Sequence, residues 1–470
     1  MKNHMRYVPH LFGNQIVKTL LLWLLPVLVV ASCAPESEKQ PEYPTPPQTP
    51  EWAINATIYE VNLRQYSEEG TFTAFAEHLP RLRDMGVDIL WFMPIHPIGE
   101  KERKGTLGSY YSVYDYLDVN PEFGTKEDFR QMVKQIHDHG MYVILDWVAN
   151  HTSWDAVWTR THPELYKTDD DGNFIIPPGT DWTDVIQLDF GNPDTHRMMH
   201  EALEYWVEEF NIDGYRCDVA DLVPTPFWNE ARRRLDEIKP VFMLAEAETP
   251  EHHTHAFDMS YAWETHHKMN ELAAGEMTIA DFEQHLEENR TRFPEFAYRM
   301  QFTSNHDENS WNGTVFERLG DGVEAFAVLS ATIPGMPLVY NGQEAAMDKR
   351  LAFFEKDPIE WEDYPMQDFY TRLLRLNQQN RALFNGVHGG DLVRISTTSD
   401  DQIFAFYRQV EHDKVVVLLN LSERDASFDI DSSYLIGTYQ DLFSDFEVTL
   451  NEHPSWTFGP WEYAVYYSND

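Results

Sequence analysis

The chain has 470 residues, of which 78 are acidic and 36 are basic, and its formal net charge at pH 7 is −42. A field this negative argues against nucleic acid and anionic membrane surfaces as partners. With only two cysteines and 42% hydrophobic residues, the chain must depend on a large apolar core rather than on disulfide bonds. Two interpretations of the acidic charge stay open, general solubility and adaptation to high salt, and nothing indicates an oligomeric state.

The N-terminal segment has the features of an export signal. Basic residues precede an apolar run at 19–31, which is shorter than the roughly 20 residues that span a membrane comfortably. The run ends in Val30-Ala31-Ser32-Cys33, which resembles the lipobox of bacterial lipoproteins. We therefore expect a signal peptide at 1–32, lipidation of Cys33 and a proline-rich tether at 33–51. The alternative is an ordinary signal peptide with a chance cysteine.

A lipid on Cys33 has two consequences. It predicts an extracytoplasmic protein, periplasmic or on the cell surface, that meets the membrane only through this anchor. It also excludes an intramolecular disulfide, because Cys217 is the other cysteine of the chain.

Between residue 52 and about residue 385, apolar strand-like runs alternate with helical stretches. This alternation predicts a parallel (β/α)8 TIM barrel, an α/β fold with its chemistry at the carboxyl ends of the strands. Two helices are readable by their apolar spacing, at 73–85 and at 126–139, the second capped by Gly140. The expected strands are 57–63, 87–93, 141–146, 212–218, 241–246, 256–261, 298–304 and 337–341.

Two segments depart from the simple alternation. Residues from about 152 to 192 are rich in Asp, Gly, Pro and Trp and are too long for a loop, so we expect a small inserted subdomain after the third strand. Residues 386–470 alternate and carry many β-branched and aromatic residues, which predicts a C-terminal antiparallel β-sandwich domain.

Four short motifs fall at the ends of the third, fourth, fifth and seventh expected strands. They are DWVANH at 146–151, GYRCD at 214–218, LAE at 244–246 and SNHD at 304–307. Arg216 and Asp218 lie two residues apart on a strand and therefore share a face, so we expect the arginine to hold Asp218 ionised and to lower its pKa. Glu246 ends an apolar strand, which should raise its pKa and keep it protonated at neutral pH. One carboxylate beside one carboxylic acid is the pair that glycoside hydrolysis uses.

These motifs resemble those of glycoside hydrolase family 13, the α-amylase family, and the resemblance extends over 52–470. It implies a nucleophile, a general acid/base and a third acid that stabilises the transition state, in the order Asp218, Glu246 and Asp307. The resemblance also implies a set of substrate-binding residues. In that set, His151 and His306 bind the sugar in the −1 subsite, Tyr111 stacks on it, Arg216 is the charge partner of the nucleophile, and Asp146 is a structural acid.

Several alternatives stay open at this stage. Glu248 is a rival acid, Tyr110 and Tyr114 are rivals of Tyr111, and Arg216–Asp218 could be an ion pair that serves only the barrel. Asn150 matches the calcium asparagine of the family, so a structural calcium ion is an expectation. The chain departs from the family at the third and fourth residues after the nucleophile, where Asp221 and Leu222 stand in place of lysine and histidine, and this puts the calcium site in doubt.

The sequence thus predicts a retaining α-glucan hydrolase that cleaves α-1,4 bonds of starch or maltooligosaccharides through a covalent glycosyl-enzyme. Asp189, at the end of VIQLD, favours α-1,4 over α-1,6 cleavage. The alternatives are a transglycosylase, an exo-acting α-glucosidase or neopullulanase of the same family, and a non-catalytic glucan-binding lipoprotein.

Overall fold

The computed structural model describes residues 46–430 and 433–468. The predicted signal peptide, Cys33 and most of the predicted tether lie outside the described residues. Contacts divide the chain into two units, Met1–Glu42 and Tyr43–Asp470, and only the second is described below. In the part of the chain that the structure describes, no helix is long and apolar enough to cross a membrane.

The end of the expected tether packs against the barrel. Pro47 and Pro50 are buried, the Thr49 hydroxyl donates to Asp258 Oδ1 at 2.7 Å, and Arg232 donates to the Gln48 carbonyl at 2.7 Å. We expected an extended linker up to residue 51. These two contacts hold Gln48 and Thr49 against Arg232 and Asp258, and the boundary at residue 51 stays a prediction.

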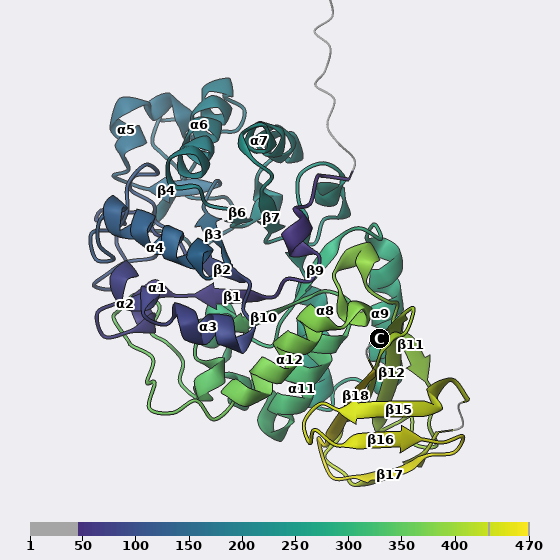
Figure 1. The fold of residues 1–470 in the computed structure, drawn as a ribbon. Coiled ribbons are helices and arrows are strands. Elements are labelled where there is room, and N and C mark those ends of the chain that lie inside the picture. The colour runs from purple at the N-terminus through teal and green to yellow at the C-terminus, as the bar shows by residue number, and fades with distance from the viewer. Residues whose placement is uncertain (1–45, 431–432, 469–470) are drawn as a thin grey trace, which may run out of the picture. The chain divides into compact units, whose positions relative to one another are not determined.

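Eight parallel strands close into a barrel in the order β1-β10-β9-β8-β7-β6-β3-β2 (Figure 1). Each of them overlaps one of the expected strands, so the predicted TIM-barrel class is confirmed. The strands are β1 (Ile58–Val61), β2 (Ile89–Phe92), β3 (Tyr142–Trp147), β6 (Gly214–Cys217), β7 (Phe242–Ala245), β8 (Met259–Tyr261), β9 (Tyr298–Gln301) and β10 (Met336–Tyr340).

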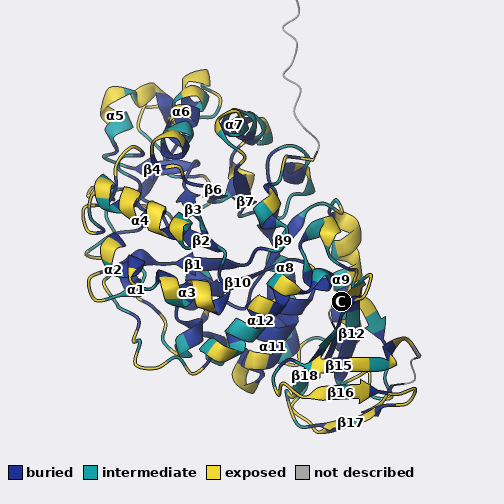
Figure 2. Cartoon of the chain, viewed as in Figure 1, coloured by how far each residue is buried: buried dark blue, intermediate teal, exposed yellow. Residues whose placement is uncertain are grey.

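The side chains of each strand alternate between two apolar layers, one inside the barrel and one between the strands and the helices. In β7, Phe242 and Leu244 join the cluster inside the barrel, whereas Met243 and Ala245 join the cluster between strands and helices. Successive side chains of a strand point to opposite faces, so a fully apolar strand serves both layers. Figure 2 shows the result, with buried strands at the centre and exposed residues along one side of helices such as α4.

The helices surround this barrel. They are α1 (Leu63–Tyr66), α2 (Phe72–Ala76), α3 (Leu79–Met85), α4 (Lys126–Asp138), α5 (Val157–Thr161), α6 (Pro193–Phe210), α7 (Thr225–Ile238), α8 (Trp263–Ala273), α9 (Ile279–Arg292), α10 (Val315–Leu319), α11 (Val323–Thr332) and α12 (Gln367–Gln379). The helix expected at 126–139 is α4, which begins with a Thr125–Asp128 capping box.

The helix expected at 73–85 is interrupted. It forms as α2 and α3, and Pro80 lies in the first turn of α3. Proline has no backbone N–H to donate and fits that turn better than a helix interior. The apolar spacing alone did not reveal this break.

The expected insertion after β3 contains a small antiparallel sheet. Its strands β4 (His151–Ser153) and β5 (Val185–Gln187) pair directly, and helix α5 lies between them in sequence. The first residue of β4 is one of the two predicted sugar-binding histidines, so this sheet fixes part of the site.

The C-terminal region is antiparallel, as expected. One sheet has the order β11-β12-β13-β18-β15-β16 and a smaller one pairs β14 with β17 (Figure 1). The boundary near residue 386 stays a prediction, because residues 43–470 form one unit. The strands are β11 (Val393–Ile395), β12 (Ile403–Val410), β13 (Asp413–Asn420), β14 (Ala426–Asp429), β15 (Gly437–Asp441), β16 (Glu447–Leu450), β17 (Ser455–Phe458) and β18 (Tyr463–Ser468).

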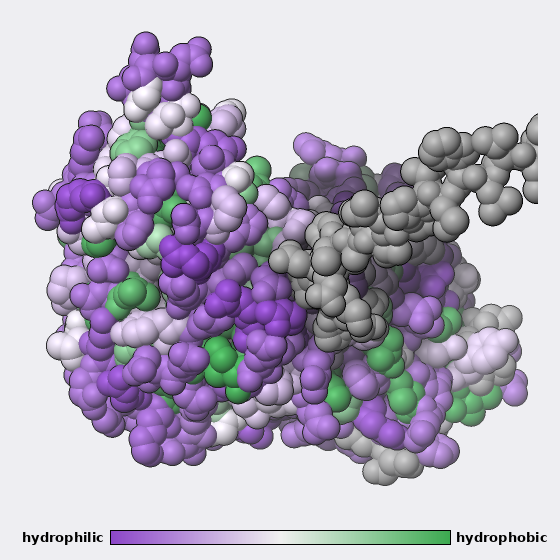
Figure 3. All heavy atoms as spheres, turned by 90° about the horizontal axis from the view of Figure 1, so that it is seen from above, coloured by the Kyte–Doolittle hydropathy of each residue, from purple (hydrophilic) through white to green (hydrophobic). Residues whose placement is uncertain are grey.

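The larger C-terminal sheet has two apolar faces. Val415 and Val417 of β13 join the cluster that contains the barrel helices, whereas Val416 and Leu418 pack with the smaller sheet. The buried Arg408 of β12 donates to the Thr332 carbonyl at the end of α11 at 3.2 Å. On the face of the molecule shown in Figure 3, hydrophilic residues predominate and hydrophobic ones are scattered.

Candidate active site

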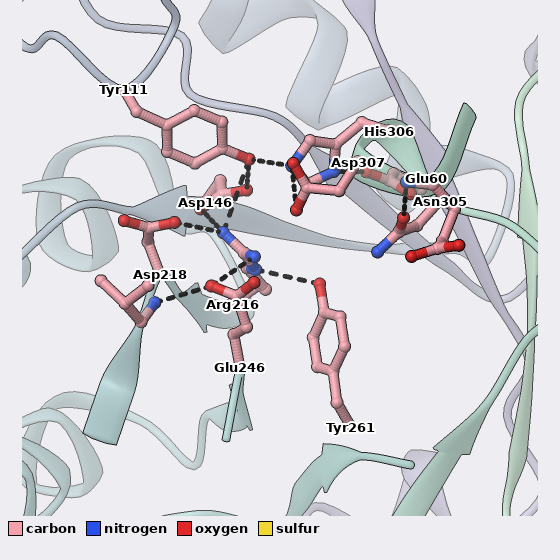
Figure 4. A network of polar contacts seen from close by, with 12 residues as sticks. Glu60, Tyr111, Asp146, Arg216, Asp218, Glu246, Tyr261, Asn305, His306 and Asp307 are labelled. Carbon is pink, nitrogen blue, oxygen red and sulfur yellow. Dashed lines mark hydrogen bonds and ion pairs between the residues drawn. The ribbon is translucent and has the colours of Figure 1, made fainter. Parts of the chain in front are cut away.

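Four barrel strands bring the four sequence motifs together. Asp146 of β3 pairs in register with Arg216 of β6, and Arg216 pairs with Leu244 of β7. The carboxyl ends of these strands therefore lie side by side, and the loop after β9 completes the group. Its members are Asp146, Arg216, Asp218, Glu246, His306 and Asp307, with Glu60, Tyr111 and Tyr261 around them (Figure 4).

Arg216 lies at the centre of this group. Its Nη1 donates to Asp146 Oδ1 at 2.8 Å and to Asp218 Oδ1 at 3.1 Å. Its Nη2 forms an ion pair with Glu246 Oε2 at 2.9 Å, and its Nε donates to the Tyr261 hydroxyl at 3.1 Å. Burial disfavours the cation, but Asp146 and Glu246 raise the pKa of Arg216 well above its usual range. Arg216 is therefore a fixed positive charge.

A glycine allows strands β6 and β7 to approach closely. Gly214 begins β6 with a φ of +149°, and a Cβ atom there would lie 1.9 Å from the Phe242 carbonyl oxygen. Only glycine fits this backbone conformation and this contact. Gly214 thus permits the close pairing of β6, which carries Arg216, with β7, which ends just before Glu246.

The acidity of Asp218 differs from the expectation. Burial raises the pKa of Asp218 well above its usual range, Glu246 raises it further, and Arg216 opposes both. The predicted lowering is therefore wrong. That prediction took only the arginine into account. It neglected the loss of water around the buried Asp218 carboxyl group and the like charge of Glu246.

Glu246 has the environment that the sequence predicted. Burial raises the pKa of Glu246, and Arg216 is the main opposing influence. Its Oε2 accepts a hydrogen bond from the Val219 amide at 2.7 Å. The rival acid, Glu248, lies elsewhere, where it pairs with Arg299 at 2.5 Å and accepts the Glu264 amide at 3.1 Å.

His306 is held as a cation between two acids. Its Nδ1 contacts Glu60 Oε1 at 2.5 Å, and its Nε2 lies 3.4 Å from Asp307 Oδ2. Burial lowers the pKa of His306, but Asp307 and Glu60 outweigh this effect and raise it to about 9. At neutral pH both ring nitrogens of His306 therefore donate hydrogen bonds.

Tyr111 is the tyrosine of the site. Its hydroxyl lies 2.8 Å from His306 Nε2 and donates to Asp146 Oδ2 at 3.0 Å (Figure 4). Its two rivals lie elsewhere, because Tyr110 bonds to Asn62 and Tyr114 to Arg160. A cationic His306 donates to the Tyr111 oxygen, so the Tyr111 hydroxyl proton is free to be donated to Asp146. Each of these hydrogen bonds therefore has one donor and one acceptor.

His151 lies at the start of β4 and is buried. Burial lowers its pKa to about 3, so the ring is neutral. Its ring packs against that of Trp182 in the insertion, with 5.3 Å between the ring centroids. The two predicted sugar-binding histidines thus differ in charge, which the sequence did not indicate.

The predicted calcium ligand does not fit a metal ion. Gln187 Nε2 donates to Asn150 Oδ1 at 2.9 Å, to the Asn150 carbonyl at 3.0 Å and to the Leu188 carbonyl at 3.0 Å. The oxygens that would bind calcium thus surround an amide nitrogen. The described residues also contain no group of three or more His, Cys, Asp or Glu that could hold a metal.

The departures from the family pattern lie beside the site. Asp221 accepts a hydrogen bond from Thr249 at 2.6 Å, and Leu222 is 52% exposed. Among the described residues, neither forms a hydrogen bond or ion pair with Asn150, whose partners are His151 and Gln187, so they do not complete a metal site.

Sequence reasoning missed three residues of the group. Glu60 of β1 binds His306, Trp91 of β2 donates to Asp146 Oδ2 at 3.1 Å, and Tyr261 of β8 binds Arg216. The only signal for Glu60 was a lone acid within an otherwise apolar strand. The two aromatic residues were indistinguishable from core residues.

Comparison with known proteins places this site in a family. The model of the alpha-amylase catalytic domain matches residues 60–184 and 180–375. The chain belongs to the alpha-amylase family. The matched region runs from β1 to α12 and includes every residue of the site, so the protein is a glycoside hydrolase of that family.

Individual relatives agree with this assignment. The alpha-amylase MalA of Haloarcula japonica is 27% identical over 437 residues, which are 86% of this chain and 62% of that protein. The chain thus spans less than two thirds of the length of this relative.

Two crystal structures resemble most of the chain. The maltogenic alpha-amylase AmyB of Thermotoga neapolitana has a TM-score of 0.81 at 29% identity, over 88% of this chain and 99% of that one. An alpha-amylase of Lactobacillus plantarum has a TM-score of 0.79 at 29% identity, over 89% of this chain and 100% of that one.

Proposed function

We propose that the chain is a retaining α-glucan hydrolase that cleaves α-1,4-glucosidic bonds of starch or maltooligosaccharides. One observation carries this proposal. Arg216 holds two carboxyl groups at the ends of neighbouring strands, Asp218 at 3.1 Å and Glu246 at 2.9 Å. The names of relatives, which include alpha-amylases, a maltogenic alpha-amylase and a cyclomaltodextrinase, support an α-glucan substrate.

The two carboxyl groups take different roles because they share a low-dielectric site with one arginine. Burial and mutual repulsion keep a proton on the pair. We assign this proton to Glu246. The assignment follows from the chemistry, because the nucleophile must be ionised to attack the anomeric carbon. On Glu246 the proton lies on Oε1, since Oε2 faces the Val219 amide and Arg216. Asp218 is then the ionised partner of Arg216.

In the first step, Glu246 protonates the glycosidic oxygen while Asp218 attacks the anomeric carbon, and the carbon–oxygen bond to the leaving group breaks. The product is a covalent β-glycosyl ester on Asp218. In the second step, Glu246 removes a proton from water, the water oxygen displaces the Asp218 carboxylate, and an α-configured sugar leaves. Two inversions give net retention.

The remaining residues bind the sugar. Asp307 and the cationic His306 face the same space as Tyr111 (Figure 4), and carboxylate and imidazolium groups suit sugar hydroxyls. The Tyr111 ring offers a flat apolar face for the sugar ring. Asp146 has both oxygens bonded within the protein, one to Arg216 and one to Tyr111, and acts as a structural anchor.

Product analysis tests this proposal. The enzyme would be incubated with amylose, pullulan and maltotriose, and the anomeric configuration would be followed by NMR, with Asp218→Asn as control. Mixed α-configured oligosaccharides from amylose, absent in the variant, are expected. Glucose alone from short chains would establish an exo-acting α-glucosidase, and elongated products at excess maltooligosaccharide a transglycosylase. Glucan binding without turnover would establish a non-catalytic glucan-binding protein.

We also propose that Cys33 carries a lipid and holds the enzyme outside the cytoplasm. The lipobox-like residues before it support this proposal. Metabolic labelling with a radioactive fatty acid should mark the wild type but not Cys33→Ala, and the variant should leave the membrane fraction. Equal labelling of both would contradict the anchor.

A further inference from the structure

A short π-helix directly after Asp307 carries an exposed tryptophan. The segment Glu308–Asn312 has π-helical bonding, and the Gly313 amide donates to the Glu308 carbonyl at 2.9 Å. Helices of this kind are rare and occur frequently at functional sites. Trp311 within it is 52% exposed. A large aromatic side chain is thus exposed to solvent shortly after Asp307 in the chain.

The π-helix is anchored on both sides, so Trp311 is held in place by its backbone. The Glu308 carboxylate pairs with His266 at 3.1 Å, and the Glu308 amide donates to Asn305 Oδ1 at 2.8 Å. The Asn309 side chain donates to the Lys349 carbonyl at 2.9 Å and accepts the Leu351 amide at 2.9 Å. The second pair of bonds ties the π-helix to the loop that follows β10.

That loop supplies Phe353, which lies between Trp311 and Tyr111. The Trp311 and Phe353 ring centroids are 5.2 Å apart. The Phe353 ring is nearly parallel to Tyr111, with 13° between the planes and 6.3 Å between the centroids. The three rings thus form a series from the partly buried Tyr111 outward to the exposed Trp311.

We propose that Trp311, supported by Phe353, is a stacking platform for a glucosyl unit that adjoins the unit bound against Tyr111. This inference rests on the proposed function and specifies where further units of the α-glucan bind. The apolar face of a pyranose ring matches an aromatic face in size. The anchored π-helix keeps the platform in position before substrate arrives, which reduces the ordering cost of binding.

The chain-length dependence of turnover tests the platform. Trp311→Ala and Trp311→Phe would be compared with the wild type on maltotriose to maltohexaose. For Trp311→Ala we expect kcat/KM to fall roughly 3- to 30-fold on the longer substrates, mainly through KM, with a smaller loss on maltotriose. Trp311→Phe should recover most of this loss because it keeps a flat ring. Phe446→Ala, a change at a 72% exposed aromatic residue in the turn between β15 and β16, should leave kcat/KM unchanged at every chain length.

Two results would overturn the platform. One is unchanged kcat/KM for Trp311→Ala at every chain length. The other is an equal loss at all lengths together with a lower melting temperature, which would indicate a structural role.

A binding experiment separates this inference from the proposed function. If the wild type does not hydrolyse any α-glucan, the proposed function fails, but maltohexaose binding can still be measured by calorimetry. Weaker binding to Trp311→Ala would then support the platform, and equal binding would refute it.

Discussion

Glu60 and His306 are 246 positions apart in the chain, yet Glu60 Oε1 lies 2.5 Å from His306 Nδ1 inside the barrel. Glu60 comes from β1 and His306 follows β9, so closure of the barrel creates this pair. The Glu60 carboxylate fixes the orientation of the imidazole and, together with Asp307, raises the pKa that keeps it charged. Under the proposed function, Glu60 is therefore a positioning residue that acts on the sugar through His306.

Glu60→Gln should make the stability of the enzyme less sensitive to alkaline pH. The pKa of His306 is raised to about 9, above its usual value of about 6.5. The stability that the cation contributes is complete below about pH 6.5 and is lost as pH rises through about 9. Removing the Glu60 charge lowers the pKa of His306, so the variant should be less stable at pH 6 and should decline less between pH 7 and 9.5.

The measurement is the melting temperature of both proteins across this pH range. Glu248→Gln is the matched control, because Glu248 pairs with Arg299 and not with a histidine. Parallel curves for the wild type and Glu60→Gln would show that Glu60 does not set the charge of His306.

Arg216→Lys should impair chemistry far more than substrate binding. The guanidinium contacts Asp146, Asp218, Glu246 and Tyr261 at once, and a lysine ammonium cannot span these positions. We expect kcat to fall by about 10²-fold or more with a small change in KM. The acidic limb of the kcat profile should move to higher pH, because Asp218 loses the charge that opposes its protonation.

Arg232→Lys is the control for this experiment. Arg232 is also buried and pairs with Asp258 and Asp236, but Asp258 precedes β8 at the opposite end of the barrel. That variant should lose stability and keep the wild-type pH profile. An Arg216→Lys enzyme with the same pH profile as the wild type would contradict the assigned role.

That these polar side chains lie together was largely predictable, because they mark the ends of apolar strands. Asp218 and Glu246 each follow directly after a strand, and a parallel barrel brings all such ends to one face. The resemblance to a known family then assigned roles to Tyr111 and Asp146. Apolar strand-like segments and the motifs that follow them are recognised from neighbouring residues alone, so the sequence was enough to predict them.

The features that sequence reasoning missed depend on distant contacts. The raised pKa of Asp218 results from burial beside Glu246, and burial of a polar group is decided by the whole fold. Glu60 is one acid in an apolar strand, and its partner follows another strand. Likewise, Gln187 contacts Asn150 only because β4 and β5 pair. The sequence therefore showed the asparagine but not that the Gln187 side-chain amide would bond to its oxygen.

Gly214→Ala should be among the most damaging small substitutions. An added Cβ would lie 1.9 Å from the Phe242 carbonyl oxygen, and the backbone φ is +149°. Separating β6 from β7 to relieve this contact would also break the arrangement around Arg216. We expect a loss of more than about 3 kcal/mol in the free energy of unfolding, or failure to fold.

Urea unfolding measures this loss. Gly140→Ala provides the comparison, since Gly140 has a φ of +69° but no atom within 4 Å of the added Cβ. It should cost only about 1–2 kcal/mol of backbone strain. Similar losses for the two variants would mean that the contact with Phe242 is relieved without disturbing the barrel.

The last prediction concerns calcium. Gln187 Nε2 lies within 3.0 Å of Asn150 Oδ1 and of the Asn150 and Leu188 carbonyl oxygens. Three acceptors around one atom require a donor, so this atom is the amide nitrogen rather than the oxygen. We expect EDTA and calcium to leave the melting temperature of the wild type unchanged. Gln187→Glu places a carboxylate among these oxygens, so it should melt lower in EDTA and recover with calcium.

Gln301→Glu separates an effect of calcium from a general effect of a buried charge. Gln301 is buried too, but its Nε2 donates to one carbonyl, that of Pro334, at 3.0 Å. That variant should lose stability without recovery in calcium, because a single additional oxygen is too few for an ion that takes six to eight ligands. A wild-type enzyme that melts lower in EDTA and recovers with calcium would show that the oxygens around Asn150 bind the ion, and that Gln187 does not replace it.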